Sequence, residues 1–340
     1  MPPTRTGSTF LLILTPLALL ALPASMAARR QDVSQVTRIV ASGAAVMWRD
    51  PGEVAALNLT YGIGGAAHAP NPQGTFTFVR EDLEHATAKF DVTDDQGVHW
   101  KVKVGSEPQA ETAATRLLWA AGYFTDEDYY LSAVTVQGLP TLTRGMAFVT
   151  AGGVVHGARL ERQLPEVKNL GTWDWVDNPL HDTREFHGLC VMMSLLNNWD
   201  ISTINNAIYD TGTERRYLVS DVGASFGNAG VGVSESKGVP KDYARSPFIE
   251  TMTPDFVDFA LHSAAFMQAA TRLSYYEQLV RVNGATKHIP RADARWLGQR
   301  LAMLSLEQIR DAFRAGGYTP EEIELCTGVV RARIAALLAL

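Results

Sequence analysis

The sequence predicts an α+β fold of two lobes, in which a small β-rich lobe with one helix precedes a larger helical lobe. The first observation is that apolar and polar residues alternate between residues 75 and 160, as in about five strands with one helical segment among them. The second is that apolar residues recur at helical spacing from Thr183 onward. With 340 residues, 46% of them hydrophobic, the chain is long enough to build two lobes that share a cleft.

The first 27 residues have the pattern of a secretory signal peptide. Arg5 is followed by an apolar run from Phe10 to Ala24, and Ser25-Met26-Ala27 has the small-x-small pattern of a peptidase site. The alternative is an uncleaved N-terminal anchor, although the run is short for a spanning helix of about 20 residues. In both cases we expect the body of the protein to be exported, periplasmic or secreted, and we expect no other membrane span.

We divide the remaining chain into an N-terminal extension (28–74), the β-rich lobe (75–165) and the helical lobe (166–340). The formal net charge is −6 and no long basic run occurs, which argues against a nucleic-acid partner. Two cysteines do not require a disulfide, so we expect Cys190 and Cys326 to be buried free thiols.

The β-rich lobe should contain strands at residues 75–79, 89–92, 98–104, 131–136 and 146–155. In the third of these strands, three apolar residues share one face, and Lys101 and Lys103 share the other. The helix that follows is predicted to begin at Ser106, because Ser106 and Gln109 match a capping box. Gly122 should end it.

The helical lobe should begin with a helix whose N-cap is Asp182 or Thr183. Its core-facing stripe consists of Phe186, Leu189, Cys190, Met193 and Leu196. A β-hairpin is expected over residues 207–219, and glycine-rich irregular structure over 223–247. From Pro254 to Leu340 the pattern is mostly helical.

Three polar side chains flank this hairpin. Asp200 and Asn205 stand five residues apart just before it, and Asp221 stands just after it. Carboxylate and amide oxygens are the ligands that divalent cations such as Mg²⁺ prefer. Asp221 and Asn205 supply such ligands, and the carboxylate of Asp200 can orient an acceptor hydroxyl or take its proton.

In this order, Asp200-x-x-x-x-Asn205 resembles the catalytic loop of the protein-kinase superfamily, and Asp221-Val-Gly resembles its D-F-G motif with Val in place of Phe. Upstream, Lys103 stands on the third strand, like the lysine that binds ATP phosphates in that family. Glu111 in the next helix resembles the acid that pairs with this lysine. The short link between strand and helix is similar to atypical members, namely HipA-like, Fam20-type and lipid kinases.

The resemblance implies a bilobal kinase-like fold and a phosphotransferase that uses ATP with Mg²⁺ or Mn²⁺. In such an enzyme Lys103 binds the phosphates and Glu111 orients Lys103. Asn205 and Asp221 hold the metal, and Asp200 is the catalytic base that acts on an unknown protein or small-molecule acceptor. The alternative is a pseudokinase-like module that binds a nucleotide or a partner without catalysis.

Several positions depart from the family pattern. No G-x-G-x-x-G motif precedes Lys103 at the expected distance. Lys101 shares a face with Lys103 and is the alternative phosphate-binding lysine, and Glu107 is the alternative acid, expected to be solvated in the first helical turn. Asn198 and Trp199 replace the usual His and Arg of the catalytic loop, so we do not expect control by a phosphorylated activation loop.

Overall fold

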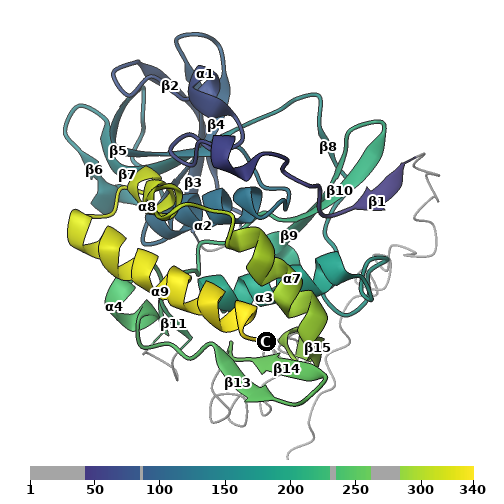
Figure 1. Ribbon diagram of the computed structural model, residues 1–340. Coiled ribbons are helices and arrows are strands. Elements are labelled where there is room, and N and C mark those ends of the chain that lie inside the picture. The colour runs from purple at the N-terminus through teal and green to yellow at the C-terminus, as the bar shows by residue number, and fades with distance from the viewer. Residues whose placement is uncertain (1–42, 85–86, 230–234, 262–283) are drawn as a thin grey trace, which may run out of the picture. The chain divides into compact units, whose positions relative to one another are not determined.

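The computed structural model describes residues 43–84, 87–229, 235–261 and 284–340 (Figure 1). Sheets and helices alternate along these residues, which confirms the predicted mixture of α and β structure. The predicted signal peptide and the first part of the N-terminal extension lie outside the described residues. None of the helices in the described ranges combines the length and the hydropathy that a membrane span requires.

The β-rich part is a six-stranded sheet that closes on itself. Its strands are β2 (Phe76–Asp82), β3 (Ala88–Asp94), β4 (His99–Val104), β5 (Asp128–Gln137), β6 (Val149–Thr150) and β7 (Val154–Arg162), in the order β4-β3-β2-β5-β7-β6. Because β4 also pairs with β7, all of these strands except β6 form a ring. Their inward side chains fill a core that includes Phe76, Phe90 and Trp100.

The pairing of β4 with β7 sets the charged face of β4. The three apolar residues of β4 point into the core, as the alternation predicted. On the opposite face, Lys101 is the ladder partner of Glu161 and Lys103 is the ladder partner of Arg159. Four charged residues from two strands therefore lie side by side, a juxtaposition that depends on the register of the two strands.

Helix α2 (Pro108–Ala120) follows β4 directly, and here the predicted capping box is wrong. The N-cap is Glu107 and not Ser106, and no side chain makes the capping hydrogen bond. Pro108 at the first helical position starts the helix, because its fixed φ angle suits a helix and its missing N–H needs no partner there. The predicted end is correct: Gly122 follows the C-cap with a φ of +99°, which favours glycine.

The predicted hairpin is present as β9 (Asn206–Asp210) and β10 (Glu214–Val219). Two further strands extend it, because β8 (Lys168–Asn169) pairs with β9 and β1 (Ala44–Val46) runs parallel to β10. The sheet order is therefore β1-β10-β9-β8. Strands β1 and β8 were not predicted, since two or three residues are too few to show an alternating pattern.

The remaining helices are α1 (Gly65–His68), α3 (Arg184–Leu196), α4 (Pro240–Tyr243), α7 (Arg291–Leu301), α8 (Leu306–Ala315) and α9 (Pro320–Leu338). Short 3-10 turns lie at Val54–Ala56, Met146–Phe148, Thr203–Asn205 and Gly284–Thr286. Two small antiparallel sheets consist of β11 (Asn228–Ala229) with β12 (Glu235–Ser236), and of β13 (Ile249–Met252), β14 (Phe256–Phe259) and β15 (Ile289–Pro290). The expectation of mostly helical structure from Pro254 therefore overlooked a sheet whose strands are too short to alternate clearly.

Helix α3 matches its prediction closely. Thr183 is the N-cap, and its hydroxyl accepts a hydrogen bond of 3.2 Å from the backbone N–H of Phe186. All residues of the predicted stripe are buried. Cys190 in this stripe and Cys326 in α9 are free, buried thiols, as expected.

The C-terminal end of α3 is held from two sides. The carbonyl of Leu196 accepts a hydrogen bond of 2.8 Å from the backbone N–H of Phe226. The carbonyl of Leu195 accepts one of 2.6 Å from the hydroxyl of Tyr243 and one of 3.0 Å from the guanidinium of Arg333. The ring of Phe226 is fully buried and packs edge-on against the ring of Tyr243. These contacts hold the last turn of α3, and so the start of the loop that leads to Asp200, in one position.

We expect Phe226→Ala to lower the free energy of unfolding by about 3–5 kcal/mol, because it leaves a cavity beside the end of α3. Phe256→Ala is the matched control, because 41% of Phe256 is exposed, and it should cost less than about 1 kcal/mol. Urea unfolding of both variants measures the difference. Equal losses would show that the packing of Phe226 does not stabilise this region.

Candidate functional site

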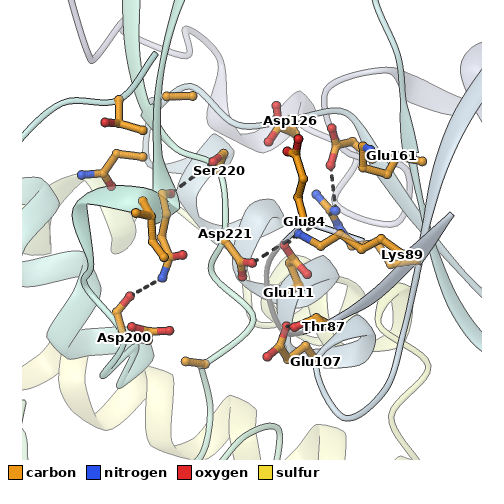
Figure 2. A pocket seen from close by; sticks show the side chains of 18 of the residues that line it. Glu84, Thr87, Lys89, Glu107, Glu111, Asp126, Glu161, Asp200, Ser220 and Asp221 are labelled. Carbon is orange, nitrogen blue, oxygen red and sulfur yellow. Dashed lines mark hydrogen bonds and ion pairs between the residues drawn. The ribbon is translucent and has the colours of Figure 1, made fainter. Parts of the chain in front are cut away.

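A cavity of about 520 Å³ lies where β3, β4, β7, helix α2 and the β9–β10 hairpin meet (Figure 2). Its charged lining consists of the acids Asp82, Glu84, Glu107, Glu111, Asp126, Glu161, Asp200 and Asp221 and the bases Lys89, Lys101, Arg159 and Lys237. In the view of Figure 2, Asp221 lies between Asp200 on one side and Glu107 and Glu111 on the other. Acids outnumber bases two to one in this lining, so a polyanionic ligand would need additional cations in order to bind.

Lys103 lies behind this lining and is 1% exposed. Its Nζ is 2.5 Å from Oε2 of Glu107, 2.8 Å from Oε2 of Glu111 and 3.0 Å from Oδ2 of Asp221. Burial works to lower the pKa of Lys103, but the three carboxylates outweigh burial and hold this pKa well above its usual range. The structure therefore brings three of the predicted site residues, Lys103, Glu111 and Asp221, together around one charged amine.

Glu111 has a second cation beside it. Its Oε1 is 3.6 Å from Nη1 of Arg159, whose Nε is 2.8 Å from Asp128 and whose Nη1 is 2.9 Å from Glu161. The side chain of Glu111 is only 1% exposed. Burial raises the pKa of Glu111 to about 7, against the opposing effects of Arg159 and Lys103. Glu111 is thus a nearly buried partner of the amine within the cavity lining.

Glu107 was expected to be solvated, and this expectation is wrong. Glu107 is 7% exposed, and its carboxylate contacts Lys103 at 2.5 Å, Lys237 at 2.6 Å and the hydroxyl of Thr87 at 3.3 Å. The reason is that Pro108 begins α2, which leaves Glu107 at the N-cap, next to the end of β4. Glu107 and Glu111 therefore both contact the amine of Lys103, so Glu107 acts together with Glu111 and does not replace it.

Lys101 has partners of its own. Its Nζ is 2.7 Å from Oδ2 of Asp82 and 3.2 Å from Oδ1 of Asp91. These two carboxylates lie on β2 and β3, and neither is among the three carboxylates that contact Lys103. Lys101 lines the cavity, but Lys103 is the lysine that contacts Asp221 and Glu111.

Hydrogen bonds from backbone and side chain tie Asp200, Asn205 and Asp221 to one another. The carbonyl of Asn205 accepts hydrogen bonds from the backbone N–H groups of Ser220 at 2.8 Å and Asp221 at 3.1 Å. The side-chain Nδ2 of Asn205 donates to the carbonyl of Asp200 at 2.8 Å. The residues before and after the hairpin are therefore locked together at its open end, within one cavity wall.

The two aspartates differ in their electrostatics. Burial works to raise the pKa of Asp221, but Lys103, Lys89 and the N–H of Gly223 outweigh it and hold the pKa well below its usual range. In Asp200, burial raises the pKa and is only partly offset by Asn205 and Lys237. Asp221 is thus a permanent anion, and Asp200 is the more basic carboxylate.

Asp221 and Asn205 have the donor atoms that a divalent metal requires. Oxygens of Glu107, Glu111 and Asp221 lie within 4.8 Å of one another, but the Lys103 amine already contacts all three carboxylates. Asp221 is the most accessible of the three, with 28% of its side chain exposed. Because Nδ2 of Asn205 is engaged, its Oδ1 is the atom left for a ligand. Carboxylate and amide oxygens are the ligands that Mg²⁺ and Mn²⁺ prefer, so these residues fit such an ion.

Sequence reasoning missed Arg159 and Lys237. Arg159 lies beyond the strand expected at 146–155, because β7 runs from Val154 to Arg162, and only the register of β7 against β4 places it beside Glu111. Lys237 lies in the glycine- and serine-rich segment, where no periodic pattern indicates which side chains turn inward. The one signal available in the sequence was a charged residue between two apolar ones, Ala158 and Leu160.

The chain matches no protein-family model and no curated protein. Among solved structures, it is similar to the proinflammatory kinase CtkA of Helicobacter pylori, at 10% identity and a TM-score of 0.43, over 77% of this chain and 96% of that one. It is similar to the Golgi casein kinase at 9% identity and a TM-score of 0.33, over 78% of this chain and 75% of that one. A Golgi casein kinase structure with Mn/ADP bound gives 10% identity and the same score and coverage. The function of this chain therefore has to be inferred from its own residues.

The raised pKa of Glu111 predicts a pH dependence of stability. Folding raises this pKa from 4.5 to about 7, so the folded state holds the proton more tightly than the unfolded chain. The resulting stabilisation is complete below about pH 4.5 and is lost as the pH rises through about 7. The Gln side chain of Glu111→Gln does not titrate. Between about pH 4.5 and 7, the unfolding free energy of the wild type should therefore fall relative to that of the variant, by at most about 1.4 kcal/mol per pH unit. Denaturant unfolding from pH 4 to 8 measures it, and a relative gain by the wild type would contradict the assignment.

Proposed function

We propose that this chain is a metal-dependent phosphotransferase of the kinase type, which moves the terminal phosphoryl group of ATP to a hydroxyl group on a protein or small-molecule acceptor. One observation carries the proposal: the buried amine of Lys103 lies 2.8 Å from Glu111 and 3.0 Å from Asp221, and these two acids line the same cavity as Asp200 and Asn205. The strand ring would form the smaller lobe of a bilobal kinase-like fold, and the part after residue 165 the larger lobe.

The acidic lining supports the requirement for metal. ATP brings about four negative charges to a cavity whose acids already outnumber its bases. In this proposal Asp221 and Asn205 hold Mg²⁺ or Mn²⁺, which neutralises charge on the phosphate oxygens. Lys103 donates N–H groups to the phosphates from β4. Glu111 keeps the amine in place and is itself fixed by Arg159, 3.6 Å away.

Asp200 is the proposed base. In the transfer, the acceptor oxygen forms a bond to the terminal phosphorus, the bond from that phosphorus to its bridging oxygen breaks, and ADP leaves. The proton of the acceptor hydroxyl passes to the carboxylate of Asp200. Burial raises the pKa of Asp200, which makes it a better proton acceptor than an exposed aspartate. Its backbone is held by Asn205 at 2.8 Å.

A pseudokinase-like module that binds a nucleotide or a partner without catalysis is the second candidate. It is favoured by the three carboxylates that contact Lys103, because they compete with phosphate for the amine. A thermal-shift scan with ATP and Mg²⁺ or Mn²⁺, combined with a turnover assay, separates the two functions. Stabilisation without turnover would favour the binding module, since a ligand that binds the folded state raises its stability.

We also propose that the protein is exported, on the strength of its first 27 residues. An exported enzyme of this kind needs a phosphoryl donor outside the cytoplasm or a target inside another cell. Fractionation of cells that express the full chain, followed by N-terminal sequencing, tests this proposal. Recovery of an uncleaved chain from the cytoplasm would overturn it.

We expect Asp221→Ala to reduce metal-dependent release of labelled phosphate from ATP on the order of 10²–10³-fold, as for the loss of one charge-stabilising group. Asp177→Ala is the control, because Asp177 is exposed and lies outside the cavity lining. No turnover by the wild type with any metal or acceptor would remove the catalytic proposal.

Asp200→Asn separates chemistry from binding. The variant keeps the size of the side chain and loses the base, so its turnover should fall while its thermal stabilisation by ATP and metal persists. Wild-type turnover in the variant would show that Asp200 is not the base. A parallel loss of binding would show that it holds the ligand instead.

A further inference from the structure

We infer that Lys237 is a catalytic residue that contacts the terminal phosphoryl group of the donor. This inference rests on the proposed function and adds to it a cation from the segment after Asp221, which no motif predicted. The catalytic-loop segment from Asn197 to Asn205 contains no Lys, Arg or His. A basic side chain that assists the metal at the reacting end of the cavity therefore has to come from elsewhere in the chain.

Lys237 approaches the site from the strand that ends at Ser236. Its Nζ is 2.6 Å from Oε1 of Glu107 and 5.2 Å from the centre of the Trp199 ring. Trp199 directly precedes Asp200, and the charge of Lys237 acts to lower the pKa of Asp200. The amine thus contacts the acid that holds Lys103 and lies near the ring of the residue that precedes Asp200. It lines the cavity, with 26% of its side chain exposed.

Two of the other bases of the lining are held by two carboxylates each, and the third lies on the far side of the cavity from Asp200. Lys101 contacts two carboxylates at 2.7 and 3.2 Å. Arg159 is buried and contacts two at 2.8 and 2.9 Å. Lys89 is 4.0 Å from Asp221 and lies on β3, on the side of the cavity opposite Asp200 in Figure 2.

Lys237, by contrast, contacts one carboxylate that it must share. Glu107 also binds Lys103 at 2.5 Å, so its single negative charge is divided between two amines. A terminal phosphate offers more negative charge and more acceptor oxygens than half of a carboxylate. When a donor is bound, Lys237 moves from Glu107 to a non-bridging oxygen of the terminal phosphate. An N–H donor there stabilises the charge of the group in transfer.

The backbone around Lys237 is held in place for this role. The carbonyl of Ser236 accepts a hydrogen bond of 3.2 Å from Nε1 of Trp199, and the hydroxyl of Ser236 donates to Asp242 at 2.7 Å. On the other side, the N–H of Gly238 donates to the carbonyl of Ser225 at 2.9 Å. The backbone is thus fixed on both sides of Lys237, and only its flexible side chain needs to move.

The test compares binding of ATP, ADP and inorganic tripolyphosphate, each with Mg²⁺, to the full chain by calorimetry. Lys237→Ala should lower the affinity for ATP about tenfold or more, the effect of losing one charge-assisted hydrogen bond. The affinity for ADP should stay within about twofold of that of the wild type. Lys237→Arg keeps the charge and should restore part of the loss. Lys241→Ala, an exposed lysine four residues on, should behave as the wild type.

Each outcome decides the inference. If Lys237 only anchors its segment to Glu107, then Lys237→Ala and Glu107→Gln will lower the affinities for ATP and for ADP by the same factor. That result would show that the inference is wrong. Wild-type affinity for ATP in Lys237→Ala also overturns it and leaves the proposed function intact. The wild type could bind tripolyphosphate but neither ATP nor ADP. If Lys237→Ala then lost tripolyphosphate binding, the result would support the contact between Lys237 and phosphate and would refute ATP as the donor. A wild type that binds none of the three ligands would overturn both.

Discussion

The site depends on one buried charge. Lys103 is 1% exposed and could not remain charged there without the three carboxylates that surround it at 2.5 to 3.0 Å. These carboxylates come from the N-cap of α2, from the body of α2 and from the strand end after the hairpin. A single amine therefore fixes the relation between the strand ring, helix α2 and the β9–β10 hairpin, and the cavity takes its shape from that relation.

Burial assigns different tasks to acids that touch the same amine. Glu111 is nearly buried and lies beside Arg159. Burial raises its pKa, and its carboxylate contacts only groups of the protein. Asp221 contacts Lys103 as well, yet more than a quarter of its side chain is open to the cavity and its pKa is held low. The same distances thus produce one positioning acid and one acid available to an external cation. Pairwise contacts alone would not distinguish the two.

The sequence predicted what local patterns encode. Alternation located β2 to β5, helical spacing located α3, and turn residues located the hairpin. Its failures are physical in origin: β1 and β8 are too short to alternate, and Pro108 displaced the expected cap. Lys103, Glu111 and Asp221 were grouped through a resemblance in motif order. The position of Arg159 depends on strand register, and that of Lys237 on an irregular segment, neither of which is written in a single stretch of chain.

The most direct measurement is a crystal structure with Mn²⁺ and a non-hydrolysable ATP analogue, in which anomalous scattering locates the metal. Our account predicts Mn²⁺ bound to the carboxylate of Asp221 and to Oδ1 of Asn205, with Nζ of Lys103 against a phosphate oxygen. Metal bound only between Glu107 and Glu111, or an analogue seated outside the cavity, would contradict it.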